Sequence, residues 1–209
     1  MTHPAGTSAE RPLRLGSATD AQVWRVATSE DPEAFGLIFD RHADAVHRYC
    51  ARRSGSADTA DDVVAIVFLE AWRKRGEVVL RHESALPWLL GVARHTLSHR
   101  ARSRLRHQRA VDRLPRTWAP DHADGVVAQL DDRRRLGEVE RAFATLGSAD
   151  QDVIALCVWQ GLEYAEAALS LGVPVGTVRS RLSRARARLA ASTDQTRPEA
   201  GSQPGPKDT

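Results

Sequence analysis

Residues 161–189 read GLEYAEAALSLGVPVGTVRSRLSRARARL, and this stretch decides the fold of the C-terminal part of the chain. Apolar residues recur at helical spacing on both sides of a break at Gly172 and Pro174. Glycine can adopt the left-handed backbone that ends a helix, and proline fits the first turn of the next helix. The pattern therefore predicts a short helix, a tight turn and a second helix over about 175–191, which together form a helix-turn-helix.

The second predicted helix is basic. Its polar positions carry arginine, serine and threonine, and the stretch contains no acid after Glu166. Arginine pairs with guanine edges and with phosphates, and the short hydroxyl side chains also reach both. The alternative is a solvated helix face, which would normally interleave acids with the bases. We therefore expect this helix to contact DNA.

Composition limits the possible classes of protein. A chain of 209 residues can form one or two small domains. The formal net charge is +3 and the pI is about 9.3, with nearly all of the base supplied by arginine. Cys50 and Cys157 each lie in an apolar helical pattern, so we expect buried thiols rather than a disulfide. No apolar run reaches the length of a membrane span and no signal peptide is apparent, so we expect a cytoplasmic protein with no membrane partner.

Helical periodicity predicts an all-α fold with two small domains. Three helical patterns over 29–107 predict the first domain, and four over 131–191 predict the second, which contains the helix-turn-helix. Residues 108–130 lose the periodicity and carry prolines and a glycine, which is typical of a flexible linker. Residues 1–28 and 192–209 have the composition of disordered tails.

A second basic run lies at the end of the first predicted domain. Between Arg94 and Arg116 there are eight arginines and one acid, Asp112. A solvated helix end is the simpler interpretation, because cations also suit the C-terminus of a helix. Eight arginines exceed what a helix end requires, so the run favours a surface that follows a nucleic-acid backbone.

Three runs of sequence resemble one family. The run PVGTVRSRLSRAR at 174–186 resembles the recognition helix of bacterial RNA polymerase sigma factors of the extracytoplasmic-function (ECF) group. The runs ADTADDVVAIVFLEAWRKR at 57–75 and PWLLGVARHTLSHRARSR at 87–104 resemble region 2 of the same family. The resemblance implies a protein that binds core RNA polymerase and directs promoter-specific transcription initiation, with no catalytic step and no cofactor. Region 4 would recognise duplex DNA at the -35 element, and region 2 would recognise the melted -10 element.

The resemblance also implies roles for individual residues. In region 4, base edges at -35 would be contacted by Arg179, Ser180, Ser183 and Arg184, and phosphates by Thr177, Arg181 and Arg186. In region 2, the candidates for -10 contact are Trp88, Arg94, His95, His99, Arg100 and Arg102. The candidates for polymerase contact are Asp58, Asp61 and Asp62. A core position suits Trp88 equally well, and acids also suit the start of a helix.

The chain departs from the family pattern at a few positions. Ala65 and Ile66 stand where a Gln-Glu pair is common, which bears on polymerase contact, and His95 stands in place of a frequent Asn near the -10 contact. His95 and His99 have a spacing that suits a metal, but no third ligand is apparent, so we expect no metal site. The rival hypotheses are an ordinary dimeric helix-turn-helix regulator and a decoy that binds polymerase without starting transcription. An anti-sigma factor that clamps the two domains together is a further possible partner.

Overall fold

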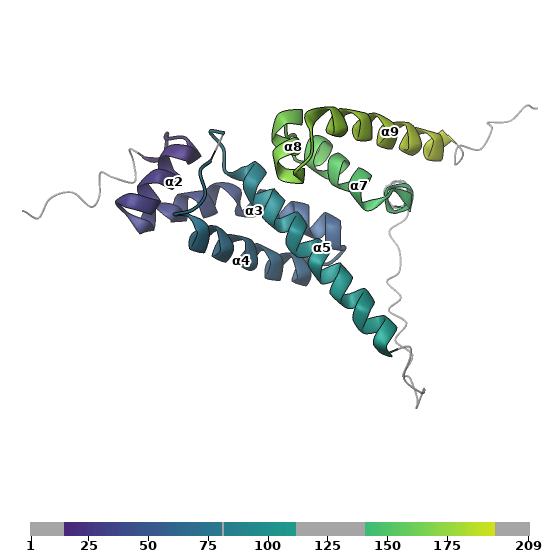
Figure 1. The fold of residues 1–209 in the computed structure, drawn as a ribbon, viewed down its shortest axis with the longest axis horizontal. Coiled ribbons are helices and arrows are strands. Elements are labelled where there is room, and N and C mark those ends of the chain that lie inside the picture. Colours follow the sequence, from purple (N-terminus) through teal and green to yellow (C-terminus); the bar gives the residue numbers. More distant parts are fainter. Residues whose placement is uncertain (1–14, 81, 112–140, 195–209) are drawn as a thin grey trace, which may run out of the picture.

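The computed structural model describes residues 15–80, 82–111 and 141–194. Within these ranges all of the regular secondary structure is helical, which confirms the predicted all-α class. Figure 1 shows two groups of helices, one from each half of the chain, lying against each other. The N-terminal group contains α2 (Asp20–Ser29), the short 3-10 helix η1 (Pro32–Ala34), α3 (Phe35–Ser54), α4 (Ala57–Lys74) and α5 (Leu86–Val111). The C-terminal group contains α7 (Ser148–Ile154), the π-helical turn η2 (Ala155–Trp159), α8 (Tyr164–Leu171) and α9 (Val175–Asp194).

The core of the N-terminal domain lies between α3, α4 and α5. The Ser56 hydroxyl accepts a hydrogen bond from the backbone N–H of Thr59 at 3.2 Å and starts α4. The helices meet through apolar side chains that are fully buried. Burial of this apolar surface is the main force that holds the three helices together. The largest of these core side chains are Ile38, Tyr49, Leu89, Leu90, Val46, Val63 and Val67.

Helix α2 corrects the prediction of a disordered tail over 1–28. Residues 20–29 are helical and pack on the N-terminal domain, with Val23 and Ala27 fully buried. The indole N–H of Trp24 donates to the carbonyl of Arg75 at 3.0 Å, which ties α2 to the end of α4. Order at α2 therefore comes from contacts with distant parts of the chain. Residues 1–14 lie outside the described ranges.

Two other predicted boundaries differ from those in the structure. Helix α5 continues to Val111 and α9 to Asp194, so 108–111 and 192–194 are helical rather than linker and tail. The rest of the predicted linker, the first part (131–140) of a helix predicted over about 131–146, and the segment 195–209 lie outside the described residues. In the parts of the chain that the structure describes, no helix is long and apolar enough to cross a membrane.

The C-terminal domain contains the predicted helix-turn-helix. Gly172 has φ of +66° and ends α8 in the left-handed conformation that glycine adopts without strain. One stripe of α9 is buried against α7 and α8, at Val178, Leu182 and Ala185. These three residues belong to the core, and Leu189 is partly buried beside them.

The two domains are in contact, with α8 packed on α5. The buried Ser170 hydroxyl donates to the Pro87 carbonyl at 2.6 Å. A Cβ atom added at Gly91 would lie 3.2 Å from the Ser170 carbonyl oxygen, so the two helix backbones approach closely there. Sequence periodicity contains no signal for this contact, because it depends on which faces of two separate domains meet.

Candidate nucleic-acid interface

Helix α9 presents the predicted DNA-reading side chains on the face opposite its buried stripe. Burial of Val178 and Leu182 turns the positions between them toward solvent. Of the seven residues implied for -35 contact, the structure exposes five: Arg179, Ser180, Ser183, Arg184 and Arg186. The other two, Thr177 and Arg181, are half-buried.

Two arginines of α9 interact with acids of α7. Arg188 forms an ion pair with Asp150, with 3.1 Å between Nη1 and Oδ2. Arg181 lies seven residues before Arg188 on the same helix face, and its charge acts on the carboxylate of Asp152. Arg181 therefore sits at the edge of the domain core, whereas Arg184 stands clear of it.

The six region 2 candidates lie on α5 but not on one face. Trp88, His95, His99 and Arg102 follow one another at intervals of seven, four and three residues, so they line one stripe of the helix. The three polar members of this stripe are exposed, and Trp88 is half-buried with its ring edge-on to Trp24 at a centroid distance of 5.8 Å. Arg94 and Arg100 flank the stripe on opposite sides and are half-buried.

Both flanking arginines are next to acids. Arg100 pairs with Asp62 of α4 at 2.8 Å, and Arg94 approaches Asp152 of the C-terminal domain at 3.9 Å. In the closed arrangement of the domains, Arg94 is therefore turned toward α7 and away from the exposed stripe of α5. Across the residues that the structure places, no group of three or more His, Cys, Asp or Glu side chains has a geometry that would hold a metal.

The three predicted polymerase-contacting acids are exposed at the start of α4. The side chains of Asp61 and Asp62 are 73% and 62% exposed, and they pair with His47 and Arg100. The Ser56 hydroxyl caps the helix, so these acids are not needed as caps. Two exposed apolar residues, Ile66 and Leu69, continue the stripe that Asp62 begins. Sequence reasoning had not assigned Leu69 to this surface, although its spacing from Asp62 was available as a signal.

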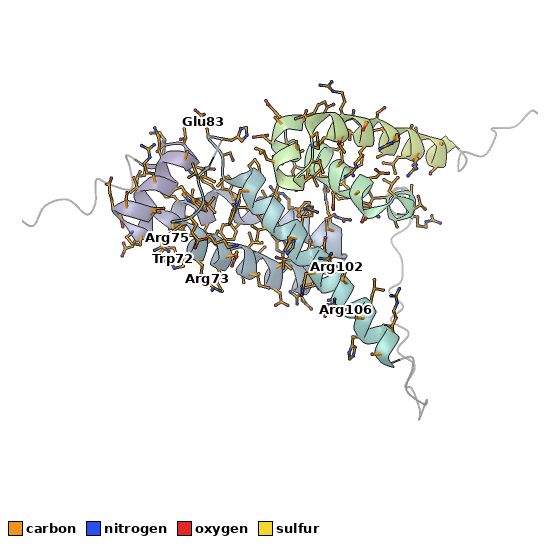
Figure 2. All side chains as sticks on the ribbon, viewed as in Figure 1. Trp72, Arg73, Arg75, Glu83, Arg102 and Arg106 are labelled. Atoms are coloured by element: carbon orange, nitrogen blue, oxygen red, sulfur yellow. The ribbon has the colours of Figure 1, made fainter. Side chains whose placement is uncertain are left out.

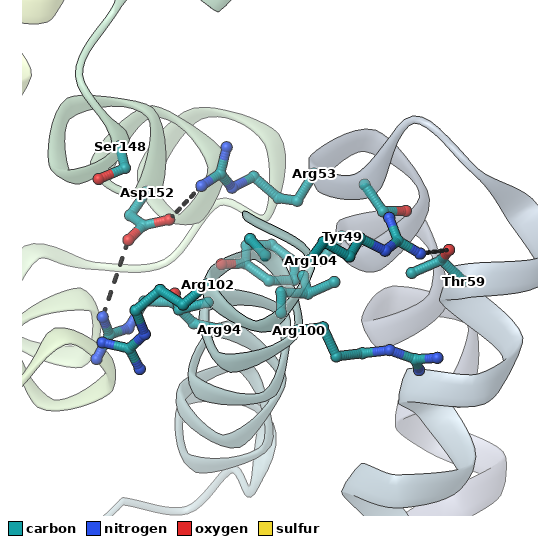
Figure 3. Close-up of a pocket in the computed structure, with 13 residues that line it drawn as sticks. Tyr49, Arg53, Thr59, Arg94, Arg100, Arg102, Arg104, Ser148 and Asp152 are labelled. Carbon is teal, nitrogen blue, oxygen red and sulfur yellow. Dashed lines mark hydrogen bonds and ion pairs between the residues drawn. The ribbon is translucent and has the colours of Figure 1, made fainter. Parts of the chain in front are cut away.

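Asp152 is a functional candidate that sequence reasoning missed. It lies in α7, is 6% exposed, and accepts a hydrogen bond from Nη2 of Arg53 at 2.8 Å. Burial raises the pKa of the Asp152 carboxyl, although the charges of Arg53 and Arg94 act in the opposite direction. A carboxylate is therefore buried at the domain interface where arginines of the N-terminal domain surround it (Figure 3).

A helix-turn-helix with a basic, exposed second helix is typical of DNA-binding proteins. Comparison with known families gives the specific class. Residues 38–119 match the family described as Sigma-70 region 2, and residues 136–189 match Sigma-70, region 4. The chain is 36% identical over 155 residues to the RNA polymerase sigma factor HrpL of Pseudomonas syringae pv. syringae, covering 70% of this chain and 79% of HrpL. It is 31% identical over 187 residues to the ECF sigma factor SigK of Mycobacterium bovis, covering 82% and 91%.

Solved structures agree with these relatives. The sigma factor RpoE of Bartonella quintana, in complex with the anti-sigma factor NepR, superposes with a TM-score of 0.61 at 25% identity and covers 79% of this chain and 99% of RpoE. CnrH, in complex with the cytosolic domain of CnrY, also gives 0.61 at 25% identity and covers 84% and 97%. The chain belongs to the ECF family of RNA polymerase sigma factors. It is thus a factor that directs RNA polymerase to promoters for transcription initiation.

Proposed function

We propose that α9 reads duplex DNA at the -35 element through Arg179, Ser180, Ser183 and Arg184. The observation that carries this assignment is the exposed, acid-free face of α9 opposite the buried Val178 and Leu182. Arginine forms bidentate contacts with guanine, and exposed arginines can reach it without disturbing the domain core. Arg186 and Thr177 flank this face and are proposed to contact phosphates, as is Arg181 at its edge.

Replacement of Arg184 by alanine is expected to weaken binding to the -35 duplex by about 1–3 kcal/mol and to relax the preference at one base pair. The matched control is Arg188→Ala, because Arg188 lies one turn further along α9 but pairs with Asp150. Binding would be measured on a set of duplexes that vary each -35 position in turn. Equal weakening on every duplex would show that Arg184 contacts a phosphate and not a base.

We propose that the exposed stripe of α5 contacts the melted -10 element. His95, His99 and Arg102 supply a polar and cationic face, with Arg94 and Arg100 beside it, and Trp88 offers an aromatic ring at one end. This assignment makes region 2 the N-terminal domain, which the helices over 20–111 form, and region 4 the C-terminal domain, which the structure describes over 141–194. The function is one of binding and positioning, and we assign no catalytic step to any residue.

We propose that core RNA polymerase contacts the acidic and apolar stripe of α4. Double replacement of Asp61 and Asp62 by alanine is expected to weaken polymerase binding about two- to thirtyfold, since exposed charge pairs contribute about 0.2–1 kcal/mol each. Binding of the same variant to the -35 duplex should be unchanged, because α9 is in the other domain. The control is Asp44→Ala, which removes an exposed acid of α3. Unchanged polymerase affinity would show that the two acids serve only their contacts with His47 and Arg100 and do not bind polymerase.

We infer that an anti-sigma factor regulates this chain. The solved RpoE relative is bound to one, and its likeness extends over most of the present chain. A protein that clamps the docked domains would hide the DNA-reading faces of both. The test is co-purification of the tagged chain from its source, followed by promoter binding before and after removal of the partner. A partner that leaves promoter binding unaffected would contradict the inference.

Run-off transcription tests the function as a whole. Purified protein would be combined with core RNA polymerase and fragmented genomic DNA of the source, and the transcript starts sequenced. Discrete starts that share -35 and -10 motifs are expected. Polymerase binding without starts would favour a decoy, and neither starts nor polymerase binding would favour an ordinary helix-turn-helix regulator.

A further inference from the structure

A cavity of about 420 Å³ lies where the two domains meet (Figure 3). The N-terminal domain contributes residues at the end of α3, the start of α4 and the middle of α5, and the C-terminal domain contributes Ser148 and Asp152 of α7. The volume falls within the range of pockets that bind small molecules. The described part of the cavity wall has a strong excess of positive charge, because it contains one acid, Asp152, and five arginines: Arg53, Arg94, Arg100, Arg102 and Arg104.

Within the described part of the protein, only some of the nitrogens of these arginines have hydrogen-bond partners. Arg53 uses both of its terminal nitrogens, one on Gln151 at 2.5 Å and one on Asp152 at 2.8 Å. Arg94 reaches Asp152 only at 3.9 Å, which is beyond hydrogen-bond distance. Arg100 has one nitrogen on Asp62. Asp152 is the one carboxylate among the described residues of the cavity wall, and its closest partner is Arg53.

Unpaired polar atoms are concentrated at this cavity. Among the described residues, four buried side-chain nitrogen or oxygen atoms have no hydrogen-bond partner, and all four belong to residues that line the cavity: Tyr49 Oη, Arg53 Nε, Arg94 Nε and Arg100 Nη1. Buried polar groups in folded proteins are nearly always paired, so a cluster of unpaired donors needs a physical explanation. Burial raises the pKa of Tyr49, as does the charge of Asp152, so its hydroxyl stays protonated and can donate.

We propose that this cavity binds a small phosphorylated ligand, whose phosphate oxygens accept hydrogen bonds from Tyr49, Arg94 and Arg100. The donors and the uncompensated positive charge call for an anion with several acceptor oxygens, and the planar guanidinium group matches phosphate geometry. Both domains form the wall, so the cavity exists only while the domains are docked. The ligand therefore favours the closed arrangement, and this proposal stands independently of which promoter elements the chain reads.

Pyrophosphate titration of the full chain at constant ionic strength, followed by calorimetry, tests the proposal. Saturable binding of one pyrophosphate per chain is expected. Arg94→Gln should weaken it about tenfold, and Tyr49→Phe about threefold, as expected for loss of a charged and a neutral hydrogen bond. Arg106→Gln is the matched control, because Arg106 is an exposed arginine of α5 that does not line the cavity (Figure 2).

Tyr49→Phe separates ligand binding from folding. The hydroxyl interacts with Arg53 but makes no well-formed hydrogen bond among the described residues, so its loss should change the thermal midpoint of the free chain only slightly. Binding unaffected by this variant, or weakened equally by Arg106→Gln, would overturn the proposal in favour of diffuse surface charge. No saturable binding would mean that the cavity holds only water. A short single-stranded oligonucleotide that displaces pyrophosphate, with the same loss in the Arg94 and Tyr49 variants, would assign the phosphate to a DNA strand and overturn the small-ligand proposal.

Discussion

Asp20→Ala is expected to lower the free energy of unfolding of the N-terminal domain by about 3–5 kcal/mol, the range found when one member of a buried ion pair is removed. Asp20 is 6% exposed and accepts hydrogen bonds from Arg41 at 2.9 Å, from the backbone N–H of Ala85 at 2.8 Å and from His42 at 2.5 Å. Its partners lie in α3 and at the start of α5, so one carboxylate links three helices. Its loss leaves the Ala85 N–H without its acceptor and takes the carboxylate away from His42 and Arg41, although Arg41 keeps its hydrogen bonds to backbone carbonyls of residues 15–18.

The effect should depend on pH. Burial alone would raise the pKa of Asp20, but hydrogen bonds from His42, Ala85 and Arg41 outweigh it and hold the pKa well below its ordinary value of 3.8. A carboxyl with a lowered pKa in the folded state contributes stability that is fully present above the unfolded value and is lost as the pH falls below it. The difference between wild type and variant in urea unfolding should therefore be constant near neutrality and shrink below about pH 4.

The control for this prediction is Asp44→Ala, since Asp44 is an exposed acid on α3. Its effect should stay within about 0.5 kcal/mol at every pH, as for most surface substitutions. A difference for Asp20→Ala that did not change with pH would show that side-chain packing, and not the charge of the carboxylate, stabilises α2.

The sequence predicts the helix-turn-helix well because its signals are local. The break at Gly172 and Pro174 and the apolar stripe through Val178 and Leu182 follow from helical geometry alone. Helix α2 was missed because its order depends on partners far along the chain, such as the Arg75 carbonyl that Trp24 contacts. A local signal did exist, since Thr19 and Gln22 form a capping box with reciprocal hydrogen bonds.

In the candidate site, too, local features could be predicted from the sequence and contacts between distant segments could not. Exposure of the α9 arginines could be predicted from their position opposite the apolar stripe. The stripe of α5 was only partly predictable, because Arg94 and Arg100 are turned toward acids on other elements. Asp152 could not be assigned from sequence, since an acid in an amphipathic helix is ordinarily solvated. Its burial arises from the docking of two domains, which no single-segment pattern encodes.

Gly91→Leu is expected to separate the two domains. A Cβ at this position would already lie 3.2 Å from the backbone oxygen of Ser170, so a full leucine side chain has no room while α8 is docked. Leucine is a better helix former than glycine by roughly 0.8 kcal/mol, so α5 itself should be stabilised rather than weakened. Small-angle X-ray scattering should show a larger radius of gyration for the variant. The control is Gly36→Leu, because a Cβ at Gly36 in α3 meets nothing within 4 Å.

Domain separation should in turn strengthen promoter binding by the free chain. The -35 and -10 elements are about 25 base pairs apart, or about 85 Å along the helix axis. Helix α5 has 26 residues and is therefore only about 39 Å long. With α8 docked on α5, α9 cannot reach an element at that distance while α5 contacts the other.

If the closed form makes up about nine-tenths of the free protein, opening it should raise the apparent affinity for a promoter fragment about tenfold. A larger radius of gyration without any gain in affinity would show that the docked domains open at no cost when they meet the promoter.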